Sequence, residues 1–442
     1  MESNVQRFLR FVADAPTAFH AVSQAEAMLL CAGYTRLSEH QPFPVRPGGR
    51  YYVTRNQSAL IAFQTPKRGL APFRIAAAHA DSPAFKLKAN AEDGAVRPYL
   101  RLNVEKYGGA ILSTWLDRPL SVAGRLLVRT PDGLESRLCD LKRDAVLIPN
   151  LPIHFNRTVN DGYAFNVQKD LMPLWGGEGS EGLLMRELAL TAGARAEDVA
   201  GHDLFLYSRV PGSVWGAQGE YFSCGRIDDL ECAWTALAAF LESHAEDHLN
   251  VYALFDNEEV GSLSKQGADS TFLRDTLDRL GEALGASRGD VKSAQAAGFM
   301  VSADNAHALH PNHPEKYDAQ NRTLMNGGVV IKHSANQKYT TDGVSAALFS
   351  EICRAARVPF QHFANRSDMP GGSTLGNLSN AHVSMNTADI GLAQLAMHSS
   401  YETAGVRDVD YMIDALRMFY QAELQMKGDG LWKTAFPTMA TV

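Results

Sequence analysis

Two adjacent glutamates, Glu258 and Glu259, follow the apolar run VYALF at residues 251–255. Adjacent carboxylates repel each other, and either water or a bound cation must relieve that repulsion. On an extended or turning backbone, neighbouring side chains point in different directions. One glutamate can therefore ligate a metal ion while the other acts as a general base on a nearby water. The pair alone therefore raises the question of whether water or a cation relieves the repulsion.

Other acids and an imidazole stand at the same kind of place in the chain. FRIAAA ends at His79, with Asp81 two residues later, and GFMVSA runs into Asp304. Asp228 stands near the start of a predicted helix. In open α/β sheets, ligands bind beyond the carboxyl ends of the strands. We therefore expect these side chains to gather at one edge of a sheet.

Carboxylates mixed with imidazole suit divalent cations. One bridging carboxylate, with one more carboxylate and one histidine for each ion, would make a two-metal site with ions roughly 3.5–4 Å apart. Sequence position alone does not choose the second histidine. The candidates are His154, His307, His310, His313, His382 and His398. Asp81 is expected to orient the His79 imidazole through its far nitrogen.

Apolar spacing predicts the elements that position these residues. Helices are expected over 4–13, 18–31, 270–285, 342–356 and 407–425, and from about Asp228; strands over 50–64 with a turn at Asn56, and over 73–79, 250–255 and 298–304. Between 92 and 220, strand patterns dominate and only 180–192 is helical in pattern. We predict an α/β fold with a mixed central sheet flanked by helices, built from residues 1–91 and 221–442 and interrupted by a β-rich insertion at 92–220.

Bulk composition narrows the partners and the compartment. The 442 residues carry a formal net charge of -7, with 45% hydrophobic and 21% charged residues, which is typical of a globular protein of about two domains. The mild acidity argues against nucleic acid or an anionic membrane as a partner. No apolar run approaches the roughly 18 residues of a membrane span, and the N-terminus lacks a signal-peptide pattern. Five scattered cysteines without a C-x-x-C pair favour the cytoplasm.

Five segments of the chain resemble the aspartyl aminopeptidase family, which are di-zinc exopeptidases. They are AAHADSP (77–83), RIDDL (226–230), FDNEEVGS (255–262), SADNAHALHPNHPEKY (302–317) and LAMHSSYE (395–402). They span most of the chain in the order of the family. The resemblance implies a zinc-exopeptidase-like fold whose β-rich insertion serves dimerisation.

The resemblance also implies the metal ligands. His79, Asp228 and Asp304 correspond to the ligands of one zinc. Asp228, Glu259 and His398 correspond to those of the other, with Asp228 bridging, so the second histidine is expected to be His398. Mn²⁺ and Co²⁺ also suit carboxylate-rich sites of this kind.

Further roles surround the expected metals. Glu258 resembles the general base, and Asp81 the carboxylate behind His79. His307 stands close to Asp304 in the sequence and is a candidate for polarising a carbonyl.

The resemblance extends to substrate and assembly. A peptide with an N-terminal Asp or Glu brings an anion to an acidic site, so a cation must compensate it. By similarity Lys332 faces the first side chain of the substrate, with Tyr339 near it, and His154 is the histidine lent to a neighbouring subunit. The family assembles from dimers into a tetrahedral dodecamer, and we expect a homo-oligomer of that kind.

The sequence thus predicts a cytoplasmic metalloaminopeptidase that removes N-terminal Asp or Glu from peptides. Two alternatives stay open at this stage. An amidohydrolase or deacylase acting on small N-acyl compounds would use the same chemistry, and an inactive assembly or cargo-binding protein could use the same scaffold. Asp81 and Glu258 argue against the inactive protein, because metal binding alone needs neither.

Overall fold

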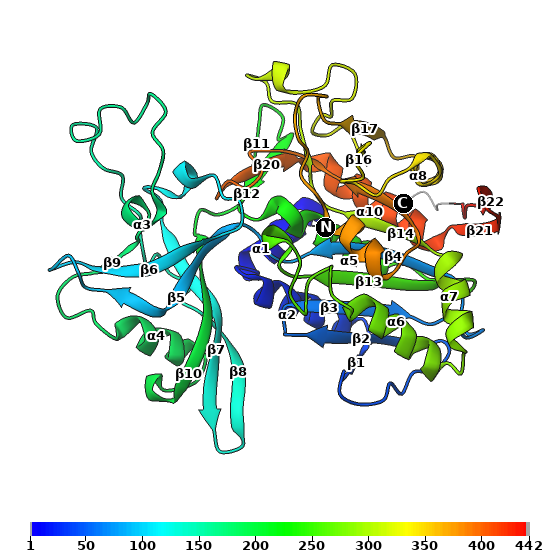
Figure 1. The fold of residues 1–442 in the computed structure, drawn as a ribbon, viewed down its shortest axis with the longest axis horizontal. Coiled ribbons are helices and arrows are strands. Elements are labelled where there is room, and N and C mark those ends of the chain that lie inside the picture. The colour runs from blue at the N-terminus through cyan, green and yellow to red at the C-terminus, as the bar shows by residue number, and fades with distance from the viewer. Residues whose placement is uncertain (1, 439–442) are drawn as a thin grey trace.

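The structure is a computed structural model that describes residues 2–438. Its largest part is a nine-stranded mixed sheet with helices on both faces (Figure 1). From edge to edge the strands are β1 (Thr35–Leu37), β2 (Arg50–Arg55), β3 (Ala59–Gln64), β13 (Leu249–Phe255), β4 (Phe73–His79), β14 (Phe299–Ala303), β18 (Asn386–Gly391), β16 (Val329–His333) and β17 (Phe360–Ala364). The predicted α/β class with a mixed central sheet is confirmed.

The four central strands β13, β4, β14 and β18 are parallel. Their carboxyl ends therefore meet at one edge of the sheet, as predicted. Both faces of these strands are buried, which explains their nearly continuous apolar sequences. In β13, for example, Tyr252 and Leu254 pack into the core on one face, while Val251 and Phe255 pack into the core on the other.

Two groups of helices cover the sheet. Helices α1 (Asn4–Asp14), α2 (Ala18–Cys31), α5 (Ile227–Leu241), α8 (Gly343–Ala356) and α10 (Val406–Gln421) cover one face, and α6 (Phe272–Ala283), α7 (Arg288–Ala296) and α9 (Leu375–His382) cover the other. The helix predicted over 407–425 ends earlier, at Gln421. The chain turns into β21 (Glu423–Gly428), which pairs with β22 (Leu431–Ala435). The buried Arg74 guanidinium donates to the Leu424 carbonyl and helps to hold this extended backbone.

A second, fully antiparallel sheet has its own hydrophobic core and lies apart from the first (Figure 1). Its strands are β8 (Gly133–Asp140), β7 (Leu120–Thr130), β10 (Val199–Ser208), β5 (Ala84–Asp93), β6 (Leu100–Tyr107) and β9 (Leu174–Gly176), with helices α3 (Val167–Asp170) and α4 (Leu183–Thr191) beside them. We call residues 84–208 the insertion. The predicted limits of 92–220 begin inside β5 and run past β10, and the division into domains stays a prediction.

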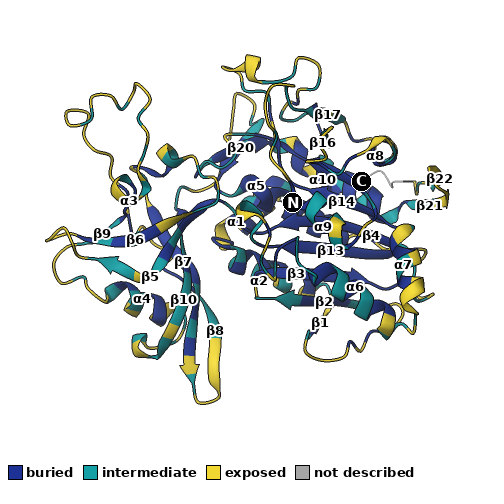
Figure 2. Ribbon diagram, viewed as in Figure 1, coloured by how far each residue is buried: buried dark blue, intermediate teal, exposed yellow. Residues whose placement is uncertain are grey.

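A long loop of the insertion, residues 149–166, projects away from both sheets (Figure 1) and is largely exposed (Figure 2). It carries apolar side chains at its surface: Phe155 is 80% exposed and Leu151 is 55% exposed. No helix among residues 2–438 has the length and apolar character that crossing a membrane requires.

A third sheet lies between these parts and contributes to the site described below. It contains β11 (Ser213–Trp215), β12 (Tyr221–Cys224), β20 (Glu402–Gly405), β19 (Ala393–Leu395) and β15 (Ala306–His307).

Candidate active site

Parallel strands deliver most of the predicted side chains to one edge of the central sheet. His79 is the last residue of β4, Asp304 follows β14, and Glu258 and Glu259 follow β13. The register places His79 beside Phe255, so the loops after these two strands start at the same level. The sheet therefore gathers residues that are far apart in the sequence, as the strand patterns predicted.

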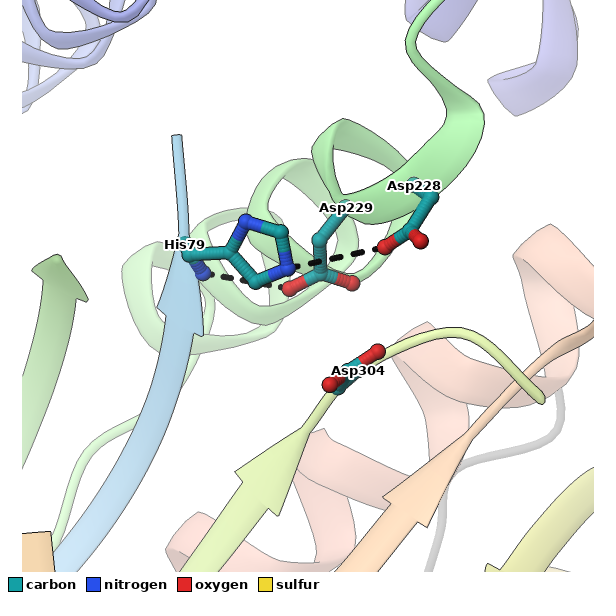
Figure 3. Close-up of side chains that lie close together, drawn as sticks. All are labelled: His79, Asp228, Asp229 and Asp304. Carbon is teal, nitrogen blue, oxygen red and sulfur yellow. Dashed lines mark hydrogen bonds and ion pairs between the residues drawn. The ribbon is translucent and has the colours of Figure 1, made fainter. Parts of the chain in front are cut away.

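Asp228 and Asp229 enter from the start of α5. Both have backbone angles outside the helical range, so their carboxylates leave the helix in different directions. Oδ1 of Asp228 lies 3.5 Å from Nε2 of His79 (Figure 3), and its Oδ2 lies 3.3 Å from Nε2 of His398. One carboxylate thus faces two imidazoles, one with each oxygen. His398 Nε2 is also 3.4 Å from Oε2 of Glu259.

The side chains form three groups whose possible ligand atoms all lie within 4.8 Å of one another. The groups are His79, Asp228, Asp229 and Asp304; His79, Glu258 and Glu259; and Asp228, Glu259 and His398. Each of the two ligand sets expected from the sequence falls inside one group, and the first group adds Asp229. Among residues 2–438, no such group contains His154, His307, His310, His313 or His382.

Several acidic oxygens in this cluster are buried without a hydrogen-bond partner. They are Oδ1 of Asp228, Oδ1 of Asp229 and Oε1 of Glu259. A buried carboxylate oxygen without a donor is costly, and a cation is one of the few partners that relieves that cost. Carboxylates with two imidazole Nε2 atoms form a donor set that zinc accepts. The residues present therefore fit zinc.

The pKa values of the clustered side chains also favour a bound cation. Burial raises the pKa of Glu259 well above its ordinary value, and the nearby Asp228 adds to the shift. Burial alone would lower the pKa of His79, but the carboxylates of Asp229 and Asp228 outweigh it and raise that pKa well above its usual range. With its pKa raised in this way, the Glu259 carboxyl holds a proton unless a cation replaces it.

Both glutamates lie in one tight turn after β13. Glu258 and Glu259 lie in a short 3₁₀ segment bounded by left-handed residues, Asn257 with φ 62° and Gly261 with φ 96°. Burial raises the pKa of Glu258 to about 8, with His79 opposing the shift and neighbouring carboxylates adding to it. A carboxyl group with a pKa near neutrality can both accept and release a proton at physiological pH.

The sequence predicts that the Asp81 carboxylate orients His79 through the far nitrogen of its ring. Nδ1 of His79 lies 3.0 Å from the main-chain oxygen of Asp81 and 3.4 Å from its Oδ1. The same carboxylate accepts the backbone N–H groups of Glu258 and Glu259, at 3.1 and 3.2 Å. Asp81 therefore links the His79 strand to the glutamate turn.

Two buried acids in the site were not singled out from the sequence. Oδ2 of Asp229 accepts the backbone N–H of His79 at 3.1 Å (Figure 3). Glu402, 1% exposed, accepts the backbone N–H groups of Asp228 at 3.1 Å and His398 at 2.7 Å. Both acids lie in segments that the sequence analysis singled out: RIDDL contains Asp229, and LAMHSSYE contains Glu402. The sequence alone does not distinguish an acid that binds a metal from one that accepts hydrogen bonds from the backbone of a ligand.

The remaining predicted residues lie at different depths. Lys332 is buried under Asp304, with Nζ 3.6 Å from its Oδ1 and 2.9 Å from the main-chain oxygen of Asn305. Tyr339 is 5% exposed, and its ring centroid lies 5.5 Å from Lys332 Nζ. His307 is exposed on β15, and His154 is exposed on the projecting loop of the insertion.

Comparison with known proteins adds to this geometry. Residues 11–420 match the family model described as aminopeptidase I zinc metalloprotease (M18). The chain belongs to the M18 aminopeptidase family. It is therefore a zinc metalloprotease of the aminopeptidase class, and the amidohydrolase alternative falls away.

Individual relatives agree with the family match. The chain is 43% identical over 423 residues to a probable M18 family aminopeptidase 2 of Clostridium acetobutylicum, covering 94% of this chain and 98% of the relative. A chain in the cryo-EM structure of the Ape4 and Nbr1 complex superposes with a TM-score of 0.92 at 34% identity, over 95% of this chain and 85% of that one. A structure of the S. cerevisiae mApe1 dodecamer gives a TM-score of 0.83 at 27% identity, over 94% and 97%.

Proposed function

We propose that this M18 aminopeptidase works with two zinc ions that share Asp228. His79 and Asp304 would complete one ligand set, and Glu259 and His398 the other. The observation that carries the proposal is the position of Asp228, whose two oxygens face two different histidines at 3.5 and 3.3 Å. Asp229 lies in the first group and is a further candidate ligand or a hydrogen-bond acceptor for the His79 backbone.

In this proposal Glu258 is the general base. Zinc bound in the cluster would supply positive charge that polarises a peptide carbonyl and makes a water more acidic. Glu258 accepts a proton from the attacking water and returns it to the departing amine. Its pKa of about 8 applies to the metal-free protein, and bound cations would lower that pKa, so that the carboxylate is ionised and able to act as a base. Asp81 holds the backbone of the glutamate turn, so it fixes where that proton is taken up.

The general-base assignment is tested with Glu258→Gln. The variant should bind the same amount of zinc as the wild type and lose roughly 10²–10⁴-fold in kcat, the usual contribution of such a group. Zinc content by elemental analysis and kcat on an aspartyl chromogenic substrate are the two readouts. Glu197→Gln, at an exposed site in the insertion, is the matched control. Wild-type kcat in Glu258→Gln would remove Glu258 from this role.

We further propose that the enzyme prefers peptides with an N-terminal Asp or Glu. Lys332 supports this preference, because its ammonium group lies 3.6 Å from Oδ1 of Asp304, a candidate metal ligand. Lys332 adds positive charge on the Asp304 side of the cluster, which would favour a substrate carboxylate placed there. Tyr339 packs against Lys332 and would help to shape the same subsite.

The preference for acidic N-termini is tested by replacing each of two lysines in turn. Lys332→Met should lower kcat/KM for peptides that begin with Asp or Glu far more than for those that begin with Ala or Leu. Lys338→Met is the control, since Lys338 is exposed on the neighbouring loop. Equal losses on both classes of peptide would place the specificity elsewhere. A free acidic peptide should also be cleaved where its N-acetylated form is not.

Finally, we propose a homo-oligomer built from dimers, up to a tetrahedral dodecamer. The similarity to a chain solved as a dodecamer supports this assembly. So do the exposed apolar residues of the projecting loop, which also carries His154, the residue proposed to reach a neighbouring active site.

We also propose that the protein is cytoplasmic, as the sequence predicted. The five cysteines, all of them free, support this proposal.

A further inference from the structure

One short segment of the insertion, residues 107–114 (YGGAILST), begins at the last residue of β6 and contacts residues of the metal cluster and its turn. Its first residue makes two hydrogen bonds there. The Tyr107 hydroxyl donates to Oδ2 of Asp81 at 2.7 Å and accepts from Nδ2 of Asn257 at 2.8 Å. Asp81 also accepts the backbone N–H groups of Glu258 and Glu259. Tyr107 is therefore linked to the glutamate turn in two ways, through Asp81 and through Asn257.

The next residues contact the histidine of the second ligand set. The Gly109 carbonyl lies 3.2 Å from Nδ1 of His398, and the Ile111 N–H donates to the His398 carbonyl at 2.9 Å. A carbonyl oxygen only accepts, so Nδ1 of His398 carries the proton. In the neutral imidazole, Nε2 then has its lone pair toward Asp228 and Glu259, as a metal ligand requires.

The two glycines let this segment come so close. A Cβ at Gly108 would lie 3.1 Å from Cβ of Glu259, and its φ of 71° is in the region that glycine favours. A Cβ at Gly109 would lie 3.3 Å from Nδ1 of His398. The insertion thus packs its backbone against two candidate ligands while leaving no side chain between them.

We infer that Tyr107 is a positioning residue for the metal centre, and that segment 107–114 couples the insertion to it. The inference rests on the proposed two-zinc site. Tyr107 is anchored in the insertion by pairing with Ala84 in β5 and by an edge-to-face contact with Phe205, 5.5 Å between ring centroids. Its hydroxyl fixes Asp81, and Asp81 fixes the turn that presents the general base and one ligand.

The test uses Tyr107→Phe, which removes one hydroxyl and keeps the ring. Apo protein is titrated with Zn²⁺ and with Co²⁺, whose absorption spectrum reports ligand geometry. We expect zinc affinity about 10–100-fold weaker than in the wild type, the usual effect of losing an outer hydrogen bond to a metal site. The Co²⁺ spectrum should change, and kcat should fall with little change in KM and recover in part at high zinc.

Tyr207→Phe is the matched control. Tyr207 also belongs to the insertion, and its hydroxyl donates at the same 2.7 Å to a buried carboxylate, Asp140, which is not part of the metal cluster. Each tyrosine variant loses one hydrogen bond to a buried carboxylate, so both should lose some thermal stability. Tyr207→Phe, however, should keep wild-type zinc affinity and Co²⁺ spectrum. Gly109→Ala, which presses on His398 instead of Asp81, should alter the Co²⁺ spectrum independently.

The outcomes separate the two proposals. If the wild type binds zinc and cleaves peptides while Tyr107→Phe matches it in affinity, spectrum and kcat, the positioning role is wrong and the active site stands. If both tyrosine variants change these readouts alike, the effect is structural and the inference is wrong. A wild type that binds no zinc overturns the proposed site together with the inference.

Discussion

In the central sheet, His79, Glu259 and Asp304 follow parallel strands whose carboxyl ends lie together. In the insertion every pair of strands in the sheet is antiparallel, so successive strands end on opposite sides of it. None of the candidate ligand groups found among residues 2–438 includes a residue of the insertion. The first region supplies candidate ligands, and the second supplies backbone groups, one tyrosine and a projecting loop. Strand direction therefore decides which region can concentrate charge and which can only support it.

The largest effect that sharpens this contrast is expected from Asp228→Asn. An amide cannot act as the shared anion between two cations, so the zinc content should fall below two ions per chain. The loss of several kcal/mol of charge stabilisation should lower kcat by about 10³-fold or more. Elemental analysis and steady-state kinetics measure both. Two zinc ions retained at full occupancy would contradict a bridging role for Asp228.

A smaller effect is expected from Glu402→Gln, on the third sheet. Its carboxylate accepts the backbone N–H groups of Asp228 and His398, and the amide would turn a donor toward one of them. Zinc affinity should weaken about 10–100-fold. Asp408→Asn is the control, because Asp408 likewise accepts two backbone N–H groups, those of Asn326 and Gly328, neither in the cluster. Equal zinc affinity in both variants would make Glu402 structural only.

The insertion is probed by Phe155→Glu on the projecting loop. If Phe155 is buried between subunits, losing its apolar contact should weaken each contact by about 1.5–3 kcal/mol, or roughly 10–100-fold in association. Light scattering after size exclusion should then show smaller assemblies. Leu190→Glu, at a 76% exposed site on α4, should leave the assembly unchanged. Unchanged assembly in Phe155→Glu would exclude the loop from the interface.

The smallest effect concerns pH and the metal-free protein. Burial raises the pKa values of Glu258 and Glu402 to about 8, so the native state favours their neutral forms. This stabilisation is complete below the pKa of an unfolded glutamate, near 4, and is lost as the pH rises through 8. The Tm of chelator-treated protein should fall by a few °C between pH 6 and 8.5.

The zinc-loaded protein is the control for this pH dependence. Bound cations stabilise the ionised carboxylates, so the Tm of the zinc-loaded protein should fall less over the same pH range. Scanning calorimetry on both forms measures the difference. Parallel curves would mean that the cluster does not govern the pH dependence.

Local patterns predicted much of the architecture. The helices at 4–13 and 18–31 and the strand ending at His79 follow from apolar spacing, and the structure has them as α1, α2 and β4. The end of α10 was predicted too late, because its last turn competes with a hairpin that Arg74 holds from across the core. Contacts of that kind leave no trace in local periodicity.

The sequence by itself determined which residues could do the chemistry. Acids and histidines at strand ends, in short family-like segments, identified Glu258 and the five candidate ligands. Only the tertiary structure decided that the two oxygens of Asp228 face two different histidines. It also decided that Glu402 accepts the backbone N–H groups of two candidate ligands, and that Tyr107 reaches the site from another sheet. Residue type and period are properties of a short stretch, whereas a hydrogen bond between residues nearly 300 positions apart depends on how whole sheets pack together.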